Sequence, residues 1–218
     1  NRQVRKAAVS YREWRERKFE QSPLPMAEPG TTPGVTFLIE ITAGGEAAAL
    51  ETIRSLQGMT VTNWRVIPVM RVGVNWDEVS NQLGGENRVK EPLIFEDFSV
   101  NLLKKSPDDF VVFSKAGDLF HPSLLHEFFA GLESSPSADV IYTDSEYRSS
   151  ISGETAPFFK PSALSPELML SVNYLSRAFL RASALADDHM GFPDLMSLEY
   201  DLDLRLMKQD TIFHHIPR

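Results

Sequence analysis

The chain has 218 residues, 42% of them hydrophobic and 24% charged, which is long and apolar enough for a sizeable core and excludes overall disorder. It contains no cysteine, which excludes disulfides, thiolate nucleophiles and zinc sites built on cysteine. The 30 acidic residues against 22 Lys and Arg give a net charge of −8. This balance argues against a nucleic-acid-binding protein, because such proteins use a basic surplus to displace counterions from phosphates.

The first 20 residues predict an amphipathic helix in which seven Lys and Arg and three Glu surround one apolar stripe. That stripe either packs on the chain's own domain or docks on a membrane surface or a partner. Residues 21–34 hold four prolines and two glycines and are expected to form a linker. No apolar run approaches the length of a membrane span. Because the chain begins with Asn1 and not with Met, we expect it to be part of a longer polypeptide.

Residues 35–218 alternate short apolar runs with helical patterns and are expected to form one domain. The predicted strands are Val35–Ile41, Trp64–Met70 (weakened by Pro68), Phe110–Phe113, Asp139–Tyr142 and the terminal segment around His214 and His215. The predicted helices are Ala47–Leu56, Phe98–Lys105, Pro122–Leu132, Pro166–Leu170 and Leu198–Lys208, while Trp76–Asn87 gives little signal. Such alternation predicts an α/β fold whose mostly parallel sheet carries helices on both faces. Ligands of such sheets bind at the carboxyl ends of the strands.

Several segments, in this order and spacing, resemble family 2 glycosyltransferases of the GT-A fold. They are FVVFSKAGDLFHPSLL (Phe110–Leu125), ADVIYTD (Ala138–Asp144), Phe159-Lys160-Pro161, SPELMLSVNY (Ser165–Tyr174), EYDLDLR (Glu199–Arg205) and His215-Ile216-Pro217. Ser55, Thr60, Asn63, Trp64 and Asn101 match the same pattern, and Tyr11–Trp14 resembles the helical lead-in of large polysaccharide synthases. The resemblance covers nearly the whole chain from Val35 onward and implies the GT-A fold.

The resemblance implies an inverting transferase that moves a sugar from a nucleotide-sugar donor to a growing surface glycan of the cell envelope. The expected partners are the nucleotide sugar, the glycan acceptor and other domains of the same polypeptide. The expected location is cytoplasmic, either free or peripheral at the inner face of the membrane. A second hypothesis is a catalytically silent domain of the same fold that serves as a scaffold or a glycan-binding module in a multidomain synthase.

The resemblance also implies site residues. Glu199 takes the place of the catalytic base, with Asp201 two residues on; helical spacing turns the two about 200° apart, so that only one can face the site, and we favour Glu199. Asp118 takes the place of the metal-binding carboxylate beside the donor diphosphate. The other residues implied at the donor are Lys115, Asp144 and Lys160, and Arg177 is placed on the acceptor side.

The sequence departs from the family pattern at the strand ends. In the metal loop, where the family pattern is Asp-x-Asp-Asp, this chain has Lys115, Ala116, Gly117 and Asp118, so that only the last carboxylate is present, and the acids that hold the nucleotide are missing from residues 40–43 and 69–73. A divalent cation, Mn²⁺ or Mg²⁺, is the expected cofactor of an active domain, but one carboxylate holds such an ion weakly, which leaves a domain without a cofactor open. His214 and His215 alternate in a strand, so they are expected to point to opposite faces and not to chelate one ion.

Overall fold

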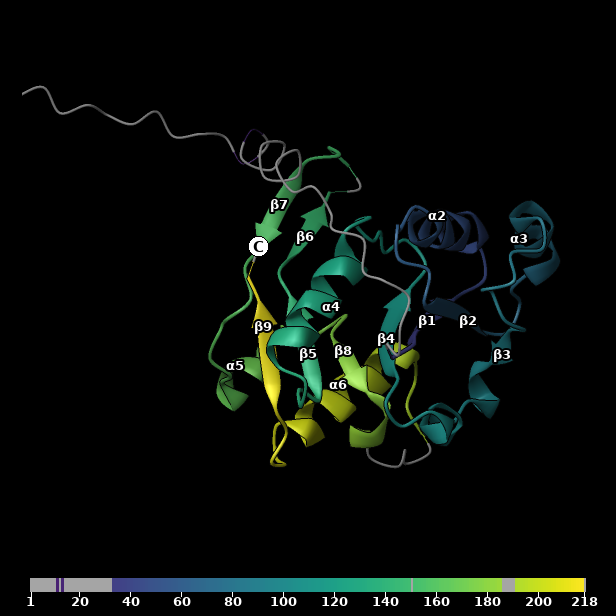
Figure 1. The fold of residues 1–218 in the computed structure, drawn as a ribbon. Helices are drawn as coiled ribbons and strands as arrows, with labels where there is room; N and C mark the ends of the chain where they lie inside the picture. Colours follow the sequence, from purple (N-terminus) through teal and green to yellow (C-terminus); the bar gives the residue numbers. More distant parts are fainter. Residues whose placement is uncertain (1–10, 12, 14–32, 150, 186–190, 218) are drawn as a thin grey trace, which may run out of the picture.

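The computed structural model describes residues 11, 13, 33–149, 151–185 and 191–217. Their centre is a seven-stranded sheet in the order β3-β2-β1-β4-β8-β5-β9 (Figure 1). The strands are β1 (Val35–Ile41), β2 (Trp64–Met70), β3 (Leu93–Ile94), β4 (Phe110–Lys115), β5 (Val140–Thr143), β8 (Phe179–Arg181) and β9 (Phe213–Ile216). Only β8 runs antiparallel to its neighbours in this sheet. The α/β fold with a mostly parallel sheet is therefore confirmed.

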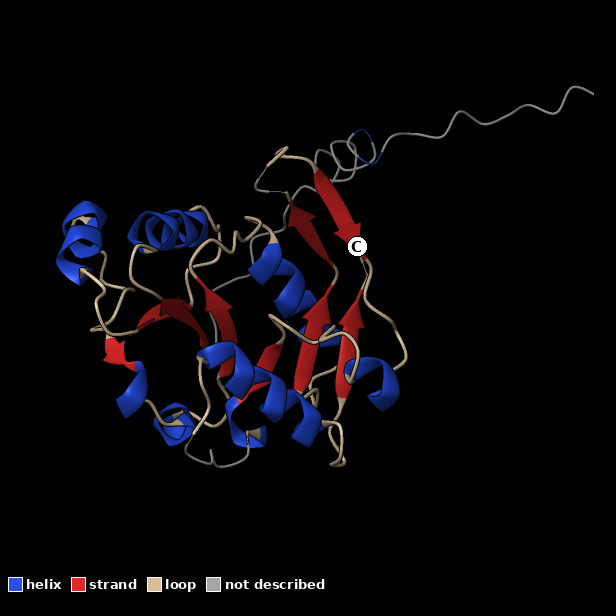
Figure 2. Cartoon of the chain, turned by 180° about the vertical axis from the view of Figure 1, so that it is seen from behind, coloured by secondary structure: helices blue, strands red, loops and turns tan. Residues whose placement is uncertain are grey.

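Helices cover both faces of the sheet (Figures 1 and 2). The helices are α2 (Glu46–Gln57), α3 (Trp76–Leu83), α4 (Leu124–Ser134), α5 (Pro166–Met169) and α6 (Leu195–Leu206). Short 3₁₀ segments lie at Phe95–Asp97, Val100–Lys105 and Ala182–Ala184. One hydrophobic core joins Phe37 of β1 to α2 and α4, and the other joins Leu38 to α6. Because consecutive residues of a strand face opposite sides, the fully buried and mostly apolar β1 serves both cores.

The sequence predicted most elements and missed or altered a few. The strands and helices expected between Val35 and Leu56 and from Trp64 to Met70 are confirmed, with Pro68 of β2 buried opposite Ile39. The segment Trp76–Leu83, which gave little signal, forms α3. The helix expected over Phe98–Lys105 is instead 3₁₀ over Val100–Lys105. A hairpin of β6 (Ser145–Arg148) and β7 (Thr155–Phe158) is additional.

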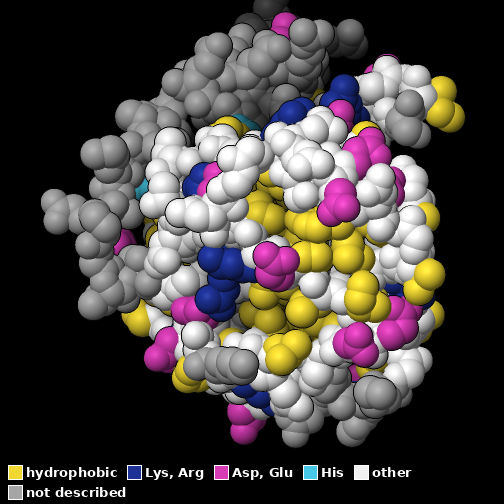
Figure 3. Space-filling view, turned by 90° about the vertical axis from the view of Figure 1, so that its right-hand side faces the viewer, with side chains coloured by type: hydrophobic (Ala, Val, Ile, Leu, Met, Phe, Trp, Pro, Cys, Tyr) yellow, Lys and Arg dark blue, Asp and Glu magenta, His cyan; other side chains and the backbone are white. Residues whose placement is uncertain are grey.

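The edge of the sheet at β3 is formed by a very short strand and is partly apolar. Figure 3, which faces this side of the molecule, shows hydrophobic side chains gathered in its middle with charged groups around them. Ile94 of β3 remains 39% exposed, and the strand is only two residues long. A strand this short leaves few unpaired backbone groups for another chain to pair with.

Two further sequence predictions concern the N-terminal region and membrane spans. The amphipathic helix and the linker fall almost entirely outside the described residues. Within the described part, the Tyr11 hydroxyl donates to Glu146 Oε1 at 2.5 Å, on β6. No helix in the described part is long and apolar enough to cross a membrane.

Candidate functional site

The loop after β4 places Asp118 at the carboxyl end of the sheet's central strands. Gly117 has φ +98°, a left-handed conformation that favours glycine. Its N–H donates to Thr52 Oγ1 of α2 at 2.9 Å, and the Ala116 N–H donates to the Glu40 carbonyl at 2.9 Å. Asp118 closes the turn, because its Oδ2 accepts the Lys115 N–H at 3.0 Å. The loop is thus tied to both α2 and β1.

Helix α6 brings Glu199 to the same place from the other face of the sheet. The helix begins after Asp194, whose side chain caps it by accepting the Ser197 N–H at 2.6 Å. Glu199 lies one turn further on and is 2% exposed. Burial raises the pKa of its carboxyl to about 7, although the charge and N–H of Arg177 and the charge of Lys160 pull it down. A carboxyl with such a pKa can accept a proton near neutral pH.

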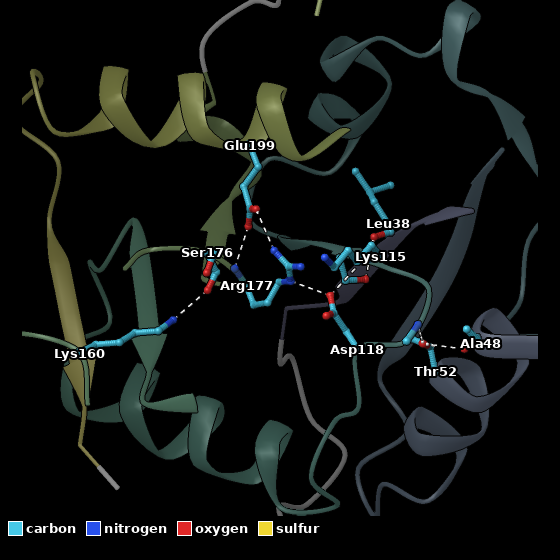
Figure 4. Close-up of polar contacts among 11 residues, drawn as sticks. Leu38, Ala48, Thr52, Lys115, Asp118, Lys160, Ser176, Arg177 and Glu199 are labelled. Atoms are coloured by element: carbon cyan, nitrogen blue, oxygen red, sulfur yellow. Dashed lines mark hydrogen bonds and ion pairs between the residues drawn. The ribbon is translucent and has the colours of Figure 1, made fainter. Parts of the chain in front are cut away.

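Arg177 joins Asp118 to Glu199 (Figure 4). Its Nε donates to Asp118 Oδ2 at 2.6 Å, and its terminal nitrogen lies 3.4 Å from Glu199 Oε2. Its backbone N–H also donates to Glu199 Oε1 at 2.7 Å. Burial lowers the pKa of the guanidinium, but the Glu199 and Asp118 charges outweigh it and hold the pKa above its usual value. The cation is therefore fixed between two carboxylates from different elements.

The backbone of Arg177 is held in an unusual conformation. Among the described residues it is the only non-glycine with positive φ, at 64°. The peptide group between Ser176 and Arg177 is hydrogen-bonded on both sides. Its carbonyl, on Ser176, accepts from Lys160 Nζ at 2.8 Å, and its N–H, on Arg177, donates to Glu199 (Figure 4). A left-handed non-glycine residue costs about 1–3 kcal/mol and persists only where its surroundings hold it. Lys160 and Glu199 together provide that constraint.

Lys160 and Asp203 complete a buried group of charges. Lys160 is 5% exposed, and burial lowers its pKa to about 8 against the opposing charges of Glu199 and Asp203. Asp203 is fully buried, and the Asn173 side chain lies close enough to lower the pKa of its carboxyl by hydrogen bonding, although neither carboxyl oxygen has a partner of good geometry within the described residues. Burial, and then the Glu199 charge, raise the pKa of Asp203 well above its usual value. We call Asp118, Lys160, Arg177, Glu199 and Asp203 the buried charge cluster.

The sequence motifs do not single out Asp203. It lies four residues after Glu199, a spacing that places both side chains on one face of a helix, and this spacing could have identified it. Asp201 points elsewhere and forms an ion pair with Arg205 one turn along the helix. The structure thus brings Glu199 and Asp203 together and leaves Asp201 outside the cluster.

Of the other residues expected at the donor, Lys115 is exposed, whereas Asp144 holds two segments of the chain together. Lys115 follows the buried part of β4 with an exposed side chain. Asp144 lies at the end of β5, where its Oδ1 accepts the Lys160 N–H at 2.8 Å and lies 3.0 Å from His215 Nε2. It therefore anchors the Lys160 loop and β9. His214 instead contacts Ser134 of α4, which confirms that the two histidines face opposite sides.

The ends of β1 and β2 carry few polar groups. Val72 is 81% exposed, and Arg71 lies over the Phe95 ring and 3.8 Å from Glu96. Glu40 of β1 is 7% exposed, and burial raises its pKa despite the Leu195 backbone N–H, Arg71 and Lys115, which lower it. Arg71 and, at the end of β4, Lys115 are the exposed or half-exposed cations that could face a ligand here.

The cluster does not fit a divalent cation. The described part of the chain contains no group of three or more His, Asp or Glu side chains arranged to hold one. The single loop carboxylate, Asp118, already accepts from Arg177 and from the Lys115 backbone. Mn²⁺ and Mg²⁺ need several oxygen ligands at once, and Asp118 Oδ2 is already engaged by two nitrogen donors.

A shallow hollow lies beside the start of α6. It has a volume of about 390 Å³ and is lined by residues 169–173 together with Asp194, Met196, Ser197 and Tyr200. The Tyr200 hydroxyl donates to the Met169 carbonyl at 2.9 Å and so fixes the ring against the opposite wall. The lining combines an aromatic ring with amide, hydroxyl and carboxyl groups.

Comparison with known proteins gives a fold but no sequence family. No protein-family model and no curated protein sequence matches the chain. Solved structures of TarS from S. aureus match with high probability: residues 1–349 at TM-score 0.55 and 11% identity, and the same fragment in complex with UDP-GlcNAc at 0.53 and 12%. A third structure, in complex with UDP, matches at 0.52 and 14%. These alignments cover 84% or 85% of this chain but only 58% to 60% of the TarS fragment. The GT-A glycosyltransferase fold is confirmed.

Proposed function

We propose that this domain is a glycosyltransferase of family 2 that transfers a sugar from a nucleotide-sugar donor to a glycan acceptor, with inversion and with Glu199 as the base. The observation that carries the proposal is the position of Glu199, at the carboxyl ends of the central strands and beside Asp118 and Arg177. In this fold class, ligands bind at that edge of the sheet. TarS structures of the same fold, in complex with UDP-GlcNAc and UDP, support a nucleotide sugar as the donor.

The proposed chemistry assigns a role to each charged group. Glu199, with a pKa near 7, takes the proton from the acceptor hydroxyl as that oxygen attacks the anomeric carbon. The bond from that carbon to the diphosphate breaks, and the leaving group departs with the electron pair. Arg177 and Lys115 supply the positive charge that stabilises the diphosphate as its negative charge grows. The growing surface glycan, other domains of the polypeptide and a cytoplasmic location remain part of this proposal.

Thermal denaturation with a panel of UDP-, GDP-, dTDP- and CMP-linked sugars tests donor binding. A donor at 100 times its Kd adds about 2.7 kcal/mol to the free energy of unfolding. For a chain of this length that corresponds to a rise of about 5–10 °C in Tm. The Glu199→Gln variant should turn that donor over at least about 100-fold more slowly than the wild type, which is the lower end of the range for losing a general base. Donor turnover unaffected by Glu199→Gln would contradict the assignment of the base.

The hollow beside α6 favours a second candidate, a silent domain that binds a glycan. Its volume of about 390 Å³ is within the range of small-molecule sites, and Tyr200 offers a flat apolar face beside Asn173 and Ser197. Binding of glycan oligomers that is weakened by Tyr200→Ala and unchanged by Glu199→Gln, without any donor effect on Tm, would identify this function. Oligomer binding without dependence on Tyr200 would exclude the hollow.

A further inference from the structure

Two carboxylates from different elements converge on a single guanidinium. Asp118 comes from the loop after β4 and Glu199 from α6, and the Arg177 guanidinium contacts one oxygen of each, at 2.6 Å and 3.4 Å. The Glu199 side chain is 2% exposed, and those of Arg177 and Asp118 are 26% and 23% exposed. A carboxylate as far removed from water as that of Glu199 needs a partner of opposite sign when it is ionised. Any group that occupies the position of the Arg177 guanidinium must therefore carry a positive charge.

The guanidinium is held in place from behind. Lys160 and Glu199 fix the two ends of the peptide group that precedes Arg177, and the residue keeps a left-handed backbone that few side chains adopt. Glu199 thus binds Arg177 twice, through the backbone N–H and through the side chain. An arginine on a flexible surface loop would not be constrained in this way. The arrangement is built around this residue.

We propose that Arg177 occupies the position of a divalent cation in this site and keeps Mn²⁺ and Mg²⁺ out of it. A divalent ion could reach Asp118 and Glu199 only by displacing a cation that is attached to the chain and pairs with both. The guanidinium supplies a fixed positive charge with several N–H donors, which suits a diphosphate as well as a carboxylate. The part of the inference that concerns the diphosphate rests on the proposed function, and the exclusion of metal does not.

Mn²⁺ titration followed by electron paramagnetic resonance tests the exclusion without any donor present. The variants are Arg177→Asn and Arg177→Gly, because both residues tolerate a left-handed backbone and neither carries a charge. We expect the wild-type domain to bind no Mn²⁺ at the cluster. Both variants should bind it at least about tenfold more tightly than the wild type, and with a Kd of about 1 mM or below. Adding Asp118→Asn to either variant should abolish the gain.

Arg177→Lys is the control that keeps the charge. It should exclude Mn²⁺ as the wild type does, and circular dichroism should show that each variant is folded. If the uncharged variants do not fold, the wild-type and Asp118→Asn titrations decide alone: an Asp118-dependent Mn²⁺ site in the wild type overturns the inference, and its absence supports it. Folded uncharged variants that gain no Mn²⁺ binding would also overturn it.

Failure of this inference is distinguishable from failure of the proposed function. Donor binding is measured separately, in EDTA and in Mn²⁺, by the shift in Tm of the wild-type domain. Equal shifts in Tm in EDTA and in Mn²⁺ would support both the guanidinium in place of a metal ion and the nucleotide-sugar site. Exclusion of Mn²⁺ without any donor shift would refute the proposed function and leave the metal inference standing. A donor shift that requires Mn²⁺ would refute the metal inference and leave the proposed function standing.

Discussion

Two regions at the same edge of the sheet differ in how far their charged groups are buried and paired. The loops that follow β1 and β2 are largely exposed, and Arg71 there forms a long ion pair with Glu96. Between the end of β4 and the first turns of α6, by contrast, each member of the buried charge cluster is linked to at least one other member by a contact or by the effect of its charge. Exposed charges contribute little to stability, whereas a buried charge left without its partner is costly. Removing a single charge should therefore change stability little in the first region and substantially in the second.

Replacing the central cation should produce the largest effect on stability. Arg177→Ala leaves Glu199 buried beside Asp203 with fewer opposing charges, and we expect the free energy of unfolding to fall by about 3 kcal/mol. Urea denaturation measures this. The matched control is Arg71→Ala, because its partner Glu96 is 52% exposed whereas Glu199 is 2% exposed, and the loss there should stay below about 1 kcal/mol. Equal losses at the two positions would remove the distinction between the regions.

Asp203→Asn should act in the opposite direction. Asp203 is fully buried beside Glu199, and burial raises its pKa well above the usual value, so at pH 8 the folded protein either ionises it at a cost or holds it protonated. Asparagine has nearly the same shape and no charge to desolvate. We expect the variant to be about 1 kcal/mol more stable than the wild type at pH 8 and little changed at pH 4, by urea denaturation at both. A loss of stability at pH 8 would show that the ionised carboxylate is required.

The pH profile of stability should reveal the cluster in the wild type. Burial raises the pKa of Glu199 from 4.5 to about 7, so the folded state binds its proton more tightly and this contribution to stability declines as pH rises from 4.5 to 7. Burial lowers the pKa of Lys160 from 10.5 to about 8, so its contribution increases again between pH 8 and 10.5. Subtracting the Tm profile of Glu199→Gln should isolate the first change, and that of Lys160→Met the second. Profiles parallel to the wild type would mean that neither group is perturbed.

The sequence predicted the framework well because packing leaves a periodic signal. The apolar run of β1 and the spaced apolar residues of α2 identify buried elements directly. The segment that became α3 has one buried residue, Val79, so its pattern was too weak to recognise. The six-residue segment at Val100 carries helical spacing but folds as 3₁₀, a distinction that spacing alone does not make.

The site was predictable only in part, because its geometry depends on contacts between distant segments. Glu199 and Asp118 follow from the family resemblance, and the turn of the helix separates Glu199 from Asp201. The role of Lys160 could not be predicted, because its partner is a backbone carbonyl at Ser176 and a carbonyl leaves no mark in sequence. The left-handed conformation of Arg177 was equally invisible, since it occurs at a residue type that rarely adopts it.

The most direct test of the account is calorimetric titration of nucleotide sugars into the wild-type domain in EDTA. The account predicts saturable binding of at least one donor. Replacing Arg177 with Asn should weaken that binding, and Arg65→Ala, at the start of β2 and so at the opposite edge of the sheet, serves as a folded comparison. No binding of any donor, with or without Mn²⁺, would contradict the central claim that this GT-A domain holds a nucleotide sugar beside Glu199.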